Sequence, residues 1–429
     1  MLRYFNHIIT VLAIISLLWC CSAKEQKQPS LRDLSRQGQI AYKNGDYQTF
    51  LHSMQQINKQ IPQHPGTRYN IACGFALTGQ IDSAFSILQR FADQGLYFNT
   101  AADSDLAALW NHPDNQSLQN KMNLHLQAVG KGITAFEINE PDLFPEGIAF
   151  DAKSQSFFIS SIHKRKVVRR DADGRVSDFI TYKTLPLWSV FAMQVDPERR
   201  LLWLCTTALP QMTGFVDSLS GKSAVLAVNI DSGELVNRFQ NDDTLHHNLS
   251  DLTLNERGEV YVVDAAAMQI MHITPEKGMQ RLQLDASFRA TQGIAYDSQS
   301  NHLFVSDYSL GIYRIDLDDG SCHLLAQNPK ICSSGVDGLY FHNNALIAIQ
   351  NGIRPHRVVK FDLNAPQTKI VNYQVLEANH RSFDEPTLGL IKDGDFYFIA
   401  NSQWGRYDKS GKPLPIDQLK NPLILHTTL

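Results

Sequence analysis

The sequence lacks the motifs that mark several large enzyme classes. Its 429 residues contain neither a Gly-x-Ser-x-Gly nucleophile elbow nor a glycine-rich phosphate loop, so serine-triad and nucleotide chemistry are disfavoured. A strong excess of basic residues is also missing. The net charge is −4, and since nucleic-acid partners favour strongly basic surfaces, no nucleic-acid partner is expected.

Cysteine is scarce, and none of the six cysteines has the spacing of a zinc site or a CxxC redox pair. Cysteine chemistry is therefore not expected to be the function. Cys73 and Cys205 lie within apolar runs and are predicted to be buried thiols. Cys322 and Cys332 flank a polar connection and could form a disulfide if the protein is exported.

The first residues have the pattern of a secretory signal. Arg3 supplies a positive start, residues 8–18 form an apolar run, and small residues precede a cleavage point after Ala23. The apolar run is too short to span a bilayer comfortably. Residues 1–23 are therefore predicted to be a signal peptide, and the remaining chain to be periplasmic or extracellular without a transmembrane span.

Two alternatives for this segment remain. It could be a lipoprotein signal that is acylated at Cys20 or Cys21, although Trp19 is a poor neighbour for that processing. It could also be an anchor that is never cleaved. Free export is the preferred interpretation.

Residues 30–127 are predicted to form a small all-α domain, because apolar residues recur at three-to-four spacing. Gly45 and Gly79 each end a helix and lie 34 residues apart, which is the tetratricopeptide period. Pro62 stands where a second helix stops, and "DSDLAALWNHPDNQSL" is expected to be a closing helix. Small residues stand where paired helices approach closely: Gly38, Ala72 and Ala84.

This region resembles tetratricopeptide repeats, a family whose arrays bind partner proteins through a concave face. The resemblance implies a possible protein partner for the helical domain. The alternative is a cap that packs against the larger domain, because fewer than three repeats leave little groove for binding.

The larger domain, predicted at residues 133–415, consists of six copies of one unit of short strands. Each copy has an apolar strand, a polar turn and a second strand that ends on a polar group. The first two strands of the copies read "EGIAFDAKSQSFFISS", "FAMQVDPERRLLWLCT", "SDLTLNERGEVYVVDA", "QGIAYDSQSNHLFVSD", "DGLYFHNNALIAIQN" and "TLGLIKDGDFYFIAN". Regular repetition of short strands indicates a propeller and not a sandwich.

The two ends of this domain are expected to close the ring. The last copy is predicted to end with "GRYDKSGK" as its third strand, and "ITAFEINE" at residues 133–140 to be its fourth strand. Such pairing leaves no open sheet edge. Residues 416–429 are then a C-terminal tail, and the fold is an all-β six-bladed propeller with a small N-terminal all-α domain.

The first strand of every blade lines the central channel, so equivalent repeat positions form a ring there. The residues at this position are predicted to be Glu146, Phe191, Ser250, Gln292, Asp337 and Thr387, with Asp251 beside the ring. Two carboxylates facing a closed channel repel unless a cation lies between them or one is protonated. Oxygen ligands suit Ca²⁺ first and Mg²⁺ or Mn²⁺ after it, and the ring offers no histidine or cysteine for zinc.

The channel motifs "PEG", "SDL", "QG" and "VDG" resemble those of the calcium-dependent six-bladed propellers. That group includes the senescence-marker-protein/gluconolactonase family, the paraoxonase-like lactonases and the strictosidine-synthase-like proteins. The resemblance implies hydrolysis of a lactone or ester, a small-molecule ligand, at a metal in the channel. Its ligands would be Glu146, Gln292 and Asp337, with Ser250 or Asp251 completing the shell and Asp337 doubling as the base.

Two positions depart from the family, because Gln292 and Ser250 stand where it usually has asparagine. A metal site tolerates little displacement of its ligands. These departures favour the alternative that the protein is a non-catalytic binding or scaffold protein of the cell envelope. The polar ring would then hold ordered water only.

Other side chains near the channel have weaker signals. His246 and His247 precede a channel strand, and His246 is the candidate proton shuttle, the alternative being a polar loop. Trp188 and Trp404 are predicted to line a channel end or, alternatively, to pack between blades.

Overall fold

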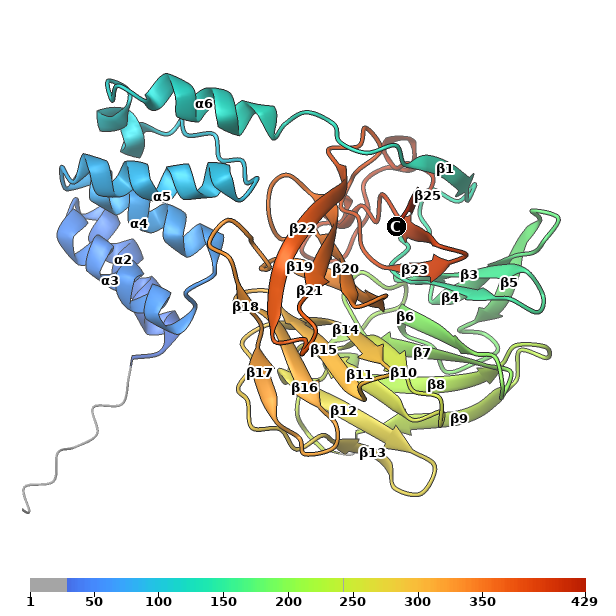
Figure 1. Cartoon of the computed structure of the whole chain (residues 1–429). Helices are drawn as coiled ribbons and strands as arrows, with labels where there is room; N and C mark the ends of the chain where they lie inside the picture. The colour runs from blue at the N-terminus through green and yellow to red at the C-terminus, as the bar shows by residue number, and fades with distance from the viewer. Residues whose placement is uncertain (1–28, 242) are drawn as a thin grey trace, which may run out of the picture.

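The computed structural model describes residues 29–241 and 243–429. The predicted signal peptide, residues 1–23, therefore lies outside the described residues. Six sheets surround a central channel, and a group of helices lies on one side of them (Figure 1). The part of the chain that the structure describes contains no helix that is long and apolar enough to cross a membrane.

Each sheet is one propeller blade whose strands run antiparallel from the channel outward, so the predicted all-β propeller is confirmed. Blade one contains β2 Ile148–Asp151, β3 Ser156–Ser161, β4 Lys166–Arg170 and β5 Val176–Thr181. Blade two contains β6 Ser189–Asp196, β7 Leu201–Thr207, β8 Ser223–Asn229 and β9 Leu235–Gln240. Blade three contains β10 Leu249–Leu254, β11 Val260–Asp264, β12 Gln269–Thr274 and β13 Gly278–Arg281.

The remaining blades follow the same plan with small additions. Blade four contains β14 Thr291–Asp297, β15 His302–Asp307, β16 Gly311–Asp316 and β17 Cys322–Leu324. Blade five contains β19 Val336–His342, β20 Ala345–Gln350, β21 Arg357–Leu363 and β22 Lys369–Ala378. Blade six contains β23 Gly389–Lys392, β24 Asp395–Ile399, β25 Leu423–Thr428 and β1 Ile133–Glu137. A short strand, β18 Ala326–Gln327, pairs in parallel with β22. Three 3₁₀ turns lie in loops: η2 Asp217–Leu219, η3 Trp404–Arg406 and η4 Ile416–Gln418.

The ring closes through β1, which is the outer strand of the last blade as predicted. The predicted partner of β1 was wrong, because β1 pairs with β25 and not with the segment "GRYDKSGK". That segment forms η3 and a turn in which the Asp408 carboxylate accepts from Ser410 N at 2.9 Å and Lys412 N at 3.0 Å. Residues 416–429 are therefore not a tail, and the propeller extends to β25.

The burial of β25 gives a test of this correction. Leu425 is fully buried among blade residues, so we expect Leu425→Ala to lower the free energy of unfolding by about 2–5 kcal/mol. Leu414→Ala, at a position that is 37% exposed in the loop before β25, is the matched control and should change stability little. Urea unfolding measures both variants, and equal stability would argue against the third-strand assignment.

The helical part contains two hairpins and a closing segment. Its elements are α2 Leu31–Lys43, α3 Tyr47–Gln60, α4 Pro65–Leu77, α5 Ile81–Asp93, η1 Ser104–Leu109 and α6 Asn115–Leu124. Gly45 and Gly79 have φ of 73° and 78°, which suits glycine at the end of a helix. A Cβ on Gly38 would meet Met54 Cε at 2.5 Å, so the predicted close approach of α2 and α3 is confirmed. The predicted single closing helix is divided into η1 and α6.

The helices pack directly against the propeller, beside the blade that contains β19 to β22 (Figure 1). Cys332 and Ile353 from propeller loops belong to the same buried cluster as Phe91 and Leu96 of the helical part. This packing also explains why Cys322 and Cys332 do not form a disulfide. All four described cysteines are free, because Cys332 lies in this cluster while Cys322 contacts a different one, so the suggested disulfide is not formed.

Candidate functional site

One mouth of the propeller channel holds a pocket of about 440 Å³, which we call the channel-mouth pocket. Five side chains that the sequence predicted for the site line it together: Glu146, Ser250, Asp251, Gln292 and Asp337. Phe191 also lines it, whereas Thr387 is buried and donates its hydroxyl to Glu146 O at 3.2 Å. The repeat alignment thus brings residues from distant parts of the chain to one place.

The glycine that follows three of these side chains has a packing reason. A Cβ on Gly147 would lie 2.3 Å from Phe191 O, and a Cβ on Gly293 would lie 2.3 Å from Asp337 O. The inner strands of neighbouring blades are therefore too close at the hub for a side chain. The motif keeps glycine there and places its variable polar side chain one residue earlier, at the mouth.

Glu146 is buried and firmly held. Its Oε2 accepts hydrogen bonds from Ser402 Oγ at 3.0 Å and from Trp404 Nε1 at 2.9 Å. Burial raises the pKa of Glu146 well above its usual range, and the nearby charge of Asp337 raises it further, against these two hydrogen bonds. A cation beside Glu146 would remove this cost.

Asp337 lines the same pocket and is also held on one side. Its Oδ2 accepts from Asn351 Nδ2 at 2.6 Å, and Asn351 is in turn fixed by a second bond to Pro386 O at 3.0 Å. Burial raises the pKa of Asp337 to about 6, the Asn351 hydrogen bond opposes this rise, and the charge of Glu385 adds to it. A carboxyl that titrates near neutral pH is suited to act as a general base.

Asp251 has a different environment from the other two acids. Its Oδ1 accepts from Leu252 N at 2.9 Å and its Oδ2 from Ile294 N at 3.1 Å, so both oxygens are bound to strands of two blades. It lines the channel-mouth pocket and also a cavity of about 530 Å³ on the opposite side of the hub. Asp251 therefore links β10 to β14, and each of its carboxylate oxygens already accepts a backbone hydrogen bond.

Two buried oxygens at the channel mouth have no partner within the part of the chain that the structure describes: Ser250 Oγ and Asn248 Oδ1. An unpaired buried polar atom costs free energy, so each calls for a water or an ion. Both residues line the channel-mouth pocket with Gln292, Glu146 and Asp337. Oxygen atoms alone, two carboxylates among them, fit the donor set of a hard divalent cation.

Some residues of the pocket were not predicted from the sequence: Asn248, Tyr308, Asn351 and Glu385. Tyr308 and Asn351 directly follow β15 and β20, the second strands of their blades. Their signal was the polar group on which the second strand of every repeat ends. Glu385 has a left-handed φ of 65°, which a glutamate rarely adopts and which holds the side chain at the pocket.

The two predicted histidines and one tryptophan are not brought to the pocket. His246 is exposed on its loop, Trp188 is partly buried against the core between blades one and two, and neither lines the channel-mouth pocket. His247 is buried, with Nδ1 at 2.5 Å from Asp264 Oδ2 and Nε2 at 2.8 Å from Asp243 Oδ1. Trp404, by contrast, lines the pocket as expected.

His247 predicts a pH dependence of stability. Burial lowers its pKa, but the two carboxylates outweigh burial, so the folded pKa is raised above the unfolded value of about 6.5. The ion pairs therefore stabilise the fold fully below pH ~6.5 and are lost as pH rises through the folded pKa. We expect the stability difference between wild type and His247→Gln to shrink from pH 5.5 to pH 9 in urea unfolding. His246→Gln is the exposed control and should show no such trend.

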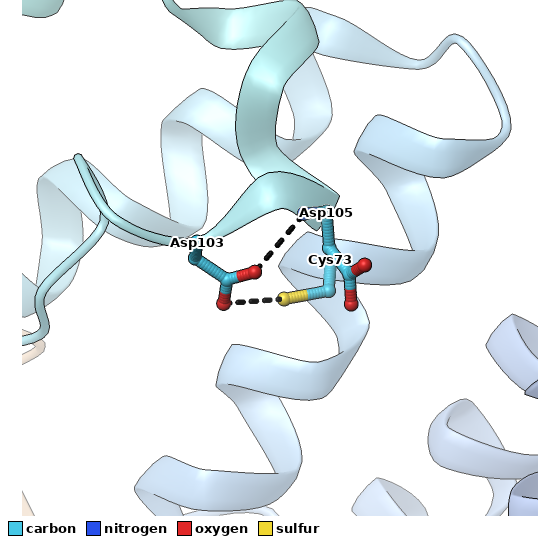
Figure 2. Close-up of side chains that lie close together, drawn as sticks. All are labelled: Cys73, Asp103 and Asp105. Atoms are coloured by element: carbon cyan, nitrogen blue, oxygen red, sulfur yellow. Dashed lines mark hydrogen bonds between the residues drawn. The ribbon is translucent and has the colours of Figure 1, made fainter.

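Among the described residues, one group of three acidic or thiol side chains has its ligand atoms within 4.8 Å of one another: Cys73, Asp103 and Asp105. Figure 2 shows Asp103 facing both the Cys73 thiol, at 3.9 Å, and the backbone of Asp105. Their carboxylates are already bound by tyrosines, since Tyr69 donates to Asp103 at 2.6 Å and Tyr42 to Asp105 at 3.0 Å. These contacts join α2, α4 and η1, so the group is structural.

No family model and no curated protein matches the chain. Among solved structures, the chain is similar to the major allergen Mala s 1 of Malassezia sympodialis, with 13% identity over 70% of this chain and 94% of that chain and a TM-score of 0.50. The fold is that of a six-bladed propeller.

Other similar structures include XC5397 of Xanthomonas campestris, a gluconolactonase, with 14% identity over 70% of this chain and 90% of that chain and a TM-score of 0.48. A luciferin-regenerating enzyme follows, with 12% identity over 71% and 96% and a TM-score of 0.47.

Proposed function

We propose that the protein is a divalent-metal-dependent hydrolase that opens lactones or related esters at the channel mouth. The observation that carries the proposal is a pair of carboxylates, the buried Glu146 and the partly buried Asp337, which share one pocket with the unpartnered oxygen of Ser250. Each carboxyl group is disfavoured as an anion where it stands. A cation bound by both carboxylates would remove that penalty and would be available to activate a substrate.

Glu146, Gln292 and Asp337 would hold the cation, with Ser250 or Asn248 completing its shell and Ca²⁺ as the preferred ion. When bound, it polarises the substrate carbonyl and makes water a better nucleophile. Asp251 is left out of this ligand set, because its oxygens are bound to Leu252 N and Ile294 N.

Asp337 and its neighbours would transfer the proton of the attacking water. Asn351 orients Asp337 through Oδ2, and the Asp337 carboxylate takes a proton from an attacking water. The water oxygen forms a bond to the carbonyl carbon, the ring C–O bond breaks, and the leaving oxygen takes the proton from Asp337. Phe191 and Leu388 supply an apolar wall that limits the access of other water.

The proposed location is outside the cytoplasm, because the pattern of residues 1–23 is that of a secretory signal. The second candidate, a non-catalytic cell-envelope binding protein, is favoured by Gln292 and Ser250 in place of the family's asparagines. In that case the tetratricopeptide-like helices would bind a partner protein.

Metal analysis combined with a hydrolysis assay tests the first proposal against the second. The purified full-length protein is expected to contain close to one Ca²⁺, Mg²⁺ or Mn²⁺ and to hydrolyse γ-butyrolactone. EDTA should abolish the activity, and added Ca²⁺ should restore it. A protein that binds none of these ions, or whose hydrolysis is indifferent to EDTA, would contradict the proposal and favour the binding protein.

A further inference from the structure

A cavity of about 500 Å³ lies between the helical part and the propeller, and we call it the interdomain cleft. The helical part contributes the start of α4 and the segment after α5, including Gly66, Tyr97 and Asn99. The propeller contributes loops that include Tyr308 and Arg354. The cleft exists only because the two parts are docked against each other.

Hydrogen bonds fix the two walls of the interdomain cleft. Tyr97 N donates to Arg354 O at 2.8 Å, and Gln94 Nε2 donates to Pro329 O at 2.9 Å. Arg357, which is 1% exposed, donates from Nη1 to Gln94 O at 3.2 Å. The cleft is therefore a preformed cavity, as small-molecule sites usually are, and not a gap between loosely joined domains.

The interdomain cleft adjoins the channel-mouth pocket, because Tyr308 and Asn351 line both. The Tyr308 hydroxyl donates to Asn351 Oδ1, and Asn351 Nδ2 donates to Asp337 Oδ2 at 2.6 Å. These two side chains therefore form the boundary between the cavities, and a ligand whose carbonyl lies beside Asp337 would reach the cleft by passing them.

Aromatic and apolar surface dominates the walls of the cleft. Tyr97 and Phe98 are half-buried, and the Phe98 ring stacks on Tyr69 with ring centroids 4.5 Å apart, which fixes its position. His356 adds an uncharged ring, because burial, and then the charge of Arg354, lower its pKa to about 4. Such walls suit a planar apolar group.

Arg354 is the one formally charged residue among the described lining of the cleft. Its charge already acts on Glu385 in the neighbouring pocket: burial raises the pKa of Glu385, Asp384 adds to the rise, and Arg354 opposes it. The guanidinium therefore has an acidic neighbour, and the cleft does not require an anionic ligand.

We propose that the helical part completes the substrate site, with the interdomain cleft binding an uncharged apolar substituent of aromatic size on the lactone or ester. This inference rests on the proposed function, since it places the substrate carbonyl at the channel mouth. It assigns the helical part to substrate selection. A chain without this part would keep the channel chemistry and lose the preference for bulky substrates.

A pair of substrates that differ by one phenyl group tests the inference. For wild type, KM for γ-phenyl-γ-butyrolactone should be about 10–100-fold lower than KM for γ-butyrolactone, because the cleft buries the phenyl ring. Asn99→Trp places an indole in the cleft from an exposed loop and should abolish this ratio by raising KM for γ-phenyl-γ-butyrolactone. Tyr97→Leu removes an aromatic ring from the wall of the cleft and should also raise KM for γ-phenyl-γ-butyrolactone.

Asn120→Trp, at an exposed position of α6 away from the cleft, is the matched control and should behave as wild type. Equal KM values for the two lactones in wild type, or the same response in Asn99→Trp and Asn120→Trp, would overturn the inference. So would a change in Asn99→Trp that affects both lactones equally.

Direct binding separates a failure of the cleft from a failure of the proposed hydrolase. Calorimetry measures γ-phenyl-γ-butyrolactone binding to the Asp337→Asn protein with and without Asn99→Trp. Binding that Asn99→Trp abolishes supports the cleft even if wild type hydrolyses neither lactone, in which case the proposed hydrolase alone falls. No binding to the Asp337→Asn protein overturns the cleft.

Discussion

Asp337→Asn is expected to lower kcat for lactone hydrolysis by about 10²–10⁴-fold, the range that a positioned general base contributes. The amide cannot take a proton from water, yet it has nearly the volume of the carboxyl group, so the pocket should keep its shape. The kinetics are measured with γ-butyrolactone at saturating Ca²⁺. The thermal midpoint should remain within a few degrees of wild type.

Asp393→Asn is the matched control for this substitution, because Asp393 lines the cavity on the other side of the hub and is exposed. It should leave kcat unchanged. If Asp337→Asn retained wild-type kcat with its metal content intact, Asp337 would not be the base. The proton would then have to leave through another group of the pocket.

Glu146→Gln should have opposite effects on the protein without and with calcium. In the calcium-free protein, Glu146 is a buried acid whose pKa is raised by burial and by Asp337, so neutralising it should increase the free energy of unfolding by about 1–3 kcal/mol. In wild type, Ca²⁺ at 100 times its Kd should add about 2.7 kcal/mol. The variant should gain almost none of that.

Urea unfolding in EDTA and in Ca²⁺ measures the free energy of unfolding of wild type and Glu146→Gln under both conditions. Glutamine can still accept from Ser402 and Trp404, so the hydrogen bonds of Glu146 serve as an internal control. A variant that is less stable than wild type in EDTA would show that the charge of Glu146 stabilises the calcium-free fold. Equal calcium stabilisation in both proteins would remove Glu146 from the ligand set.

The repeats explain why so much of the site could be predicted from the sequence. Blades are related by rotation about one channel, so equivalent positions such as Glu146 and Asp337 must converge there whatever their distance along the chain. The same logic extended to the ends of the second strands would have found Asn351. The convergence follows from symmetry and needs no knowledge of individual contacts.

The parts that were missed depend on information that the repeats do not carry. β25 was assigned to a tail because a long loop after β24 separates it from its blade, and the nearer segment "GRYDKSGK" looked like a strand. The interdomain cleft depends on how the helical part docks, through single contacts such as Tyr97 to Arg354. Neither feature has a counterpart in another copy of the repeat.

The pairing of β1 with β25 has a consequence for biosynthesis. These two segments are the first and the last of the ring to leave the ribosome, so the last blade cannot be completed until residue 428 has been synthesised. Until then the nascent ring has an open edge that can pair with another chain, whereas the helical part is already free to fold. Ribosome-bound chains that stop before β25 should therefore be the species that chaperones recognise most strongly.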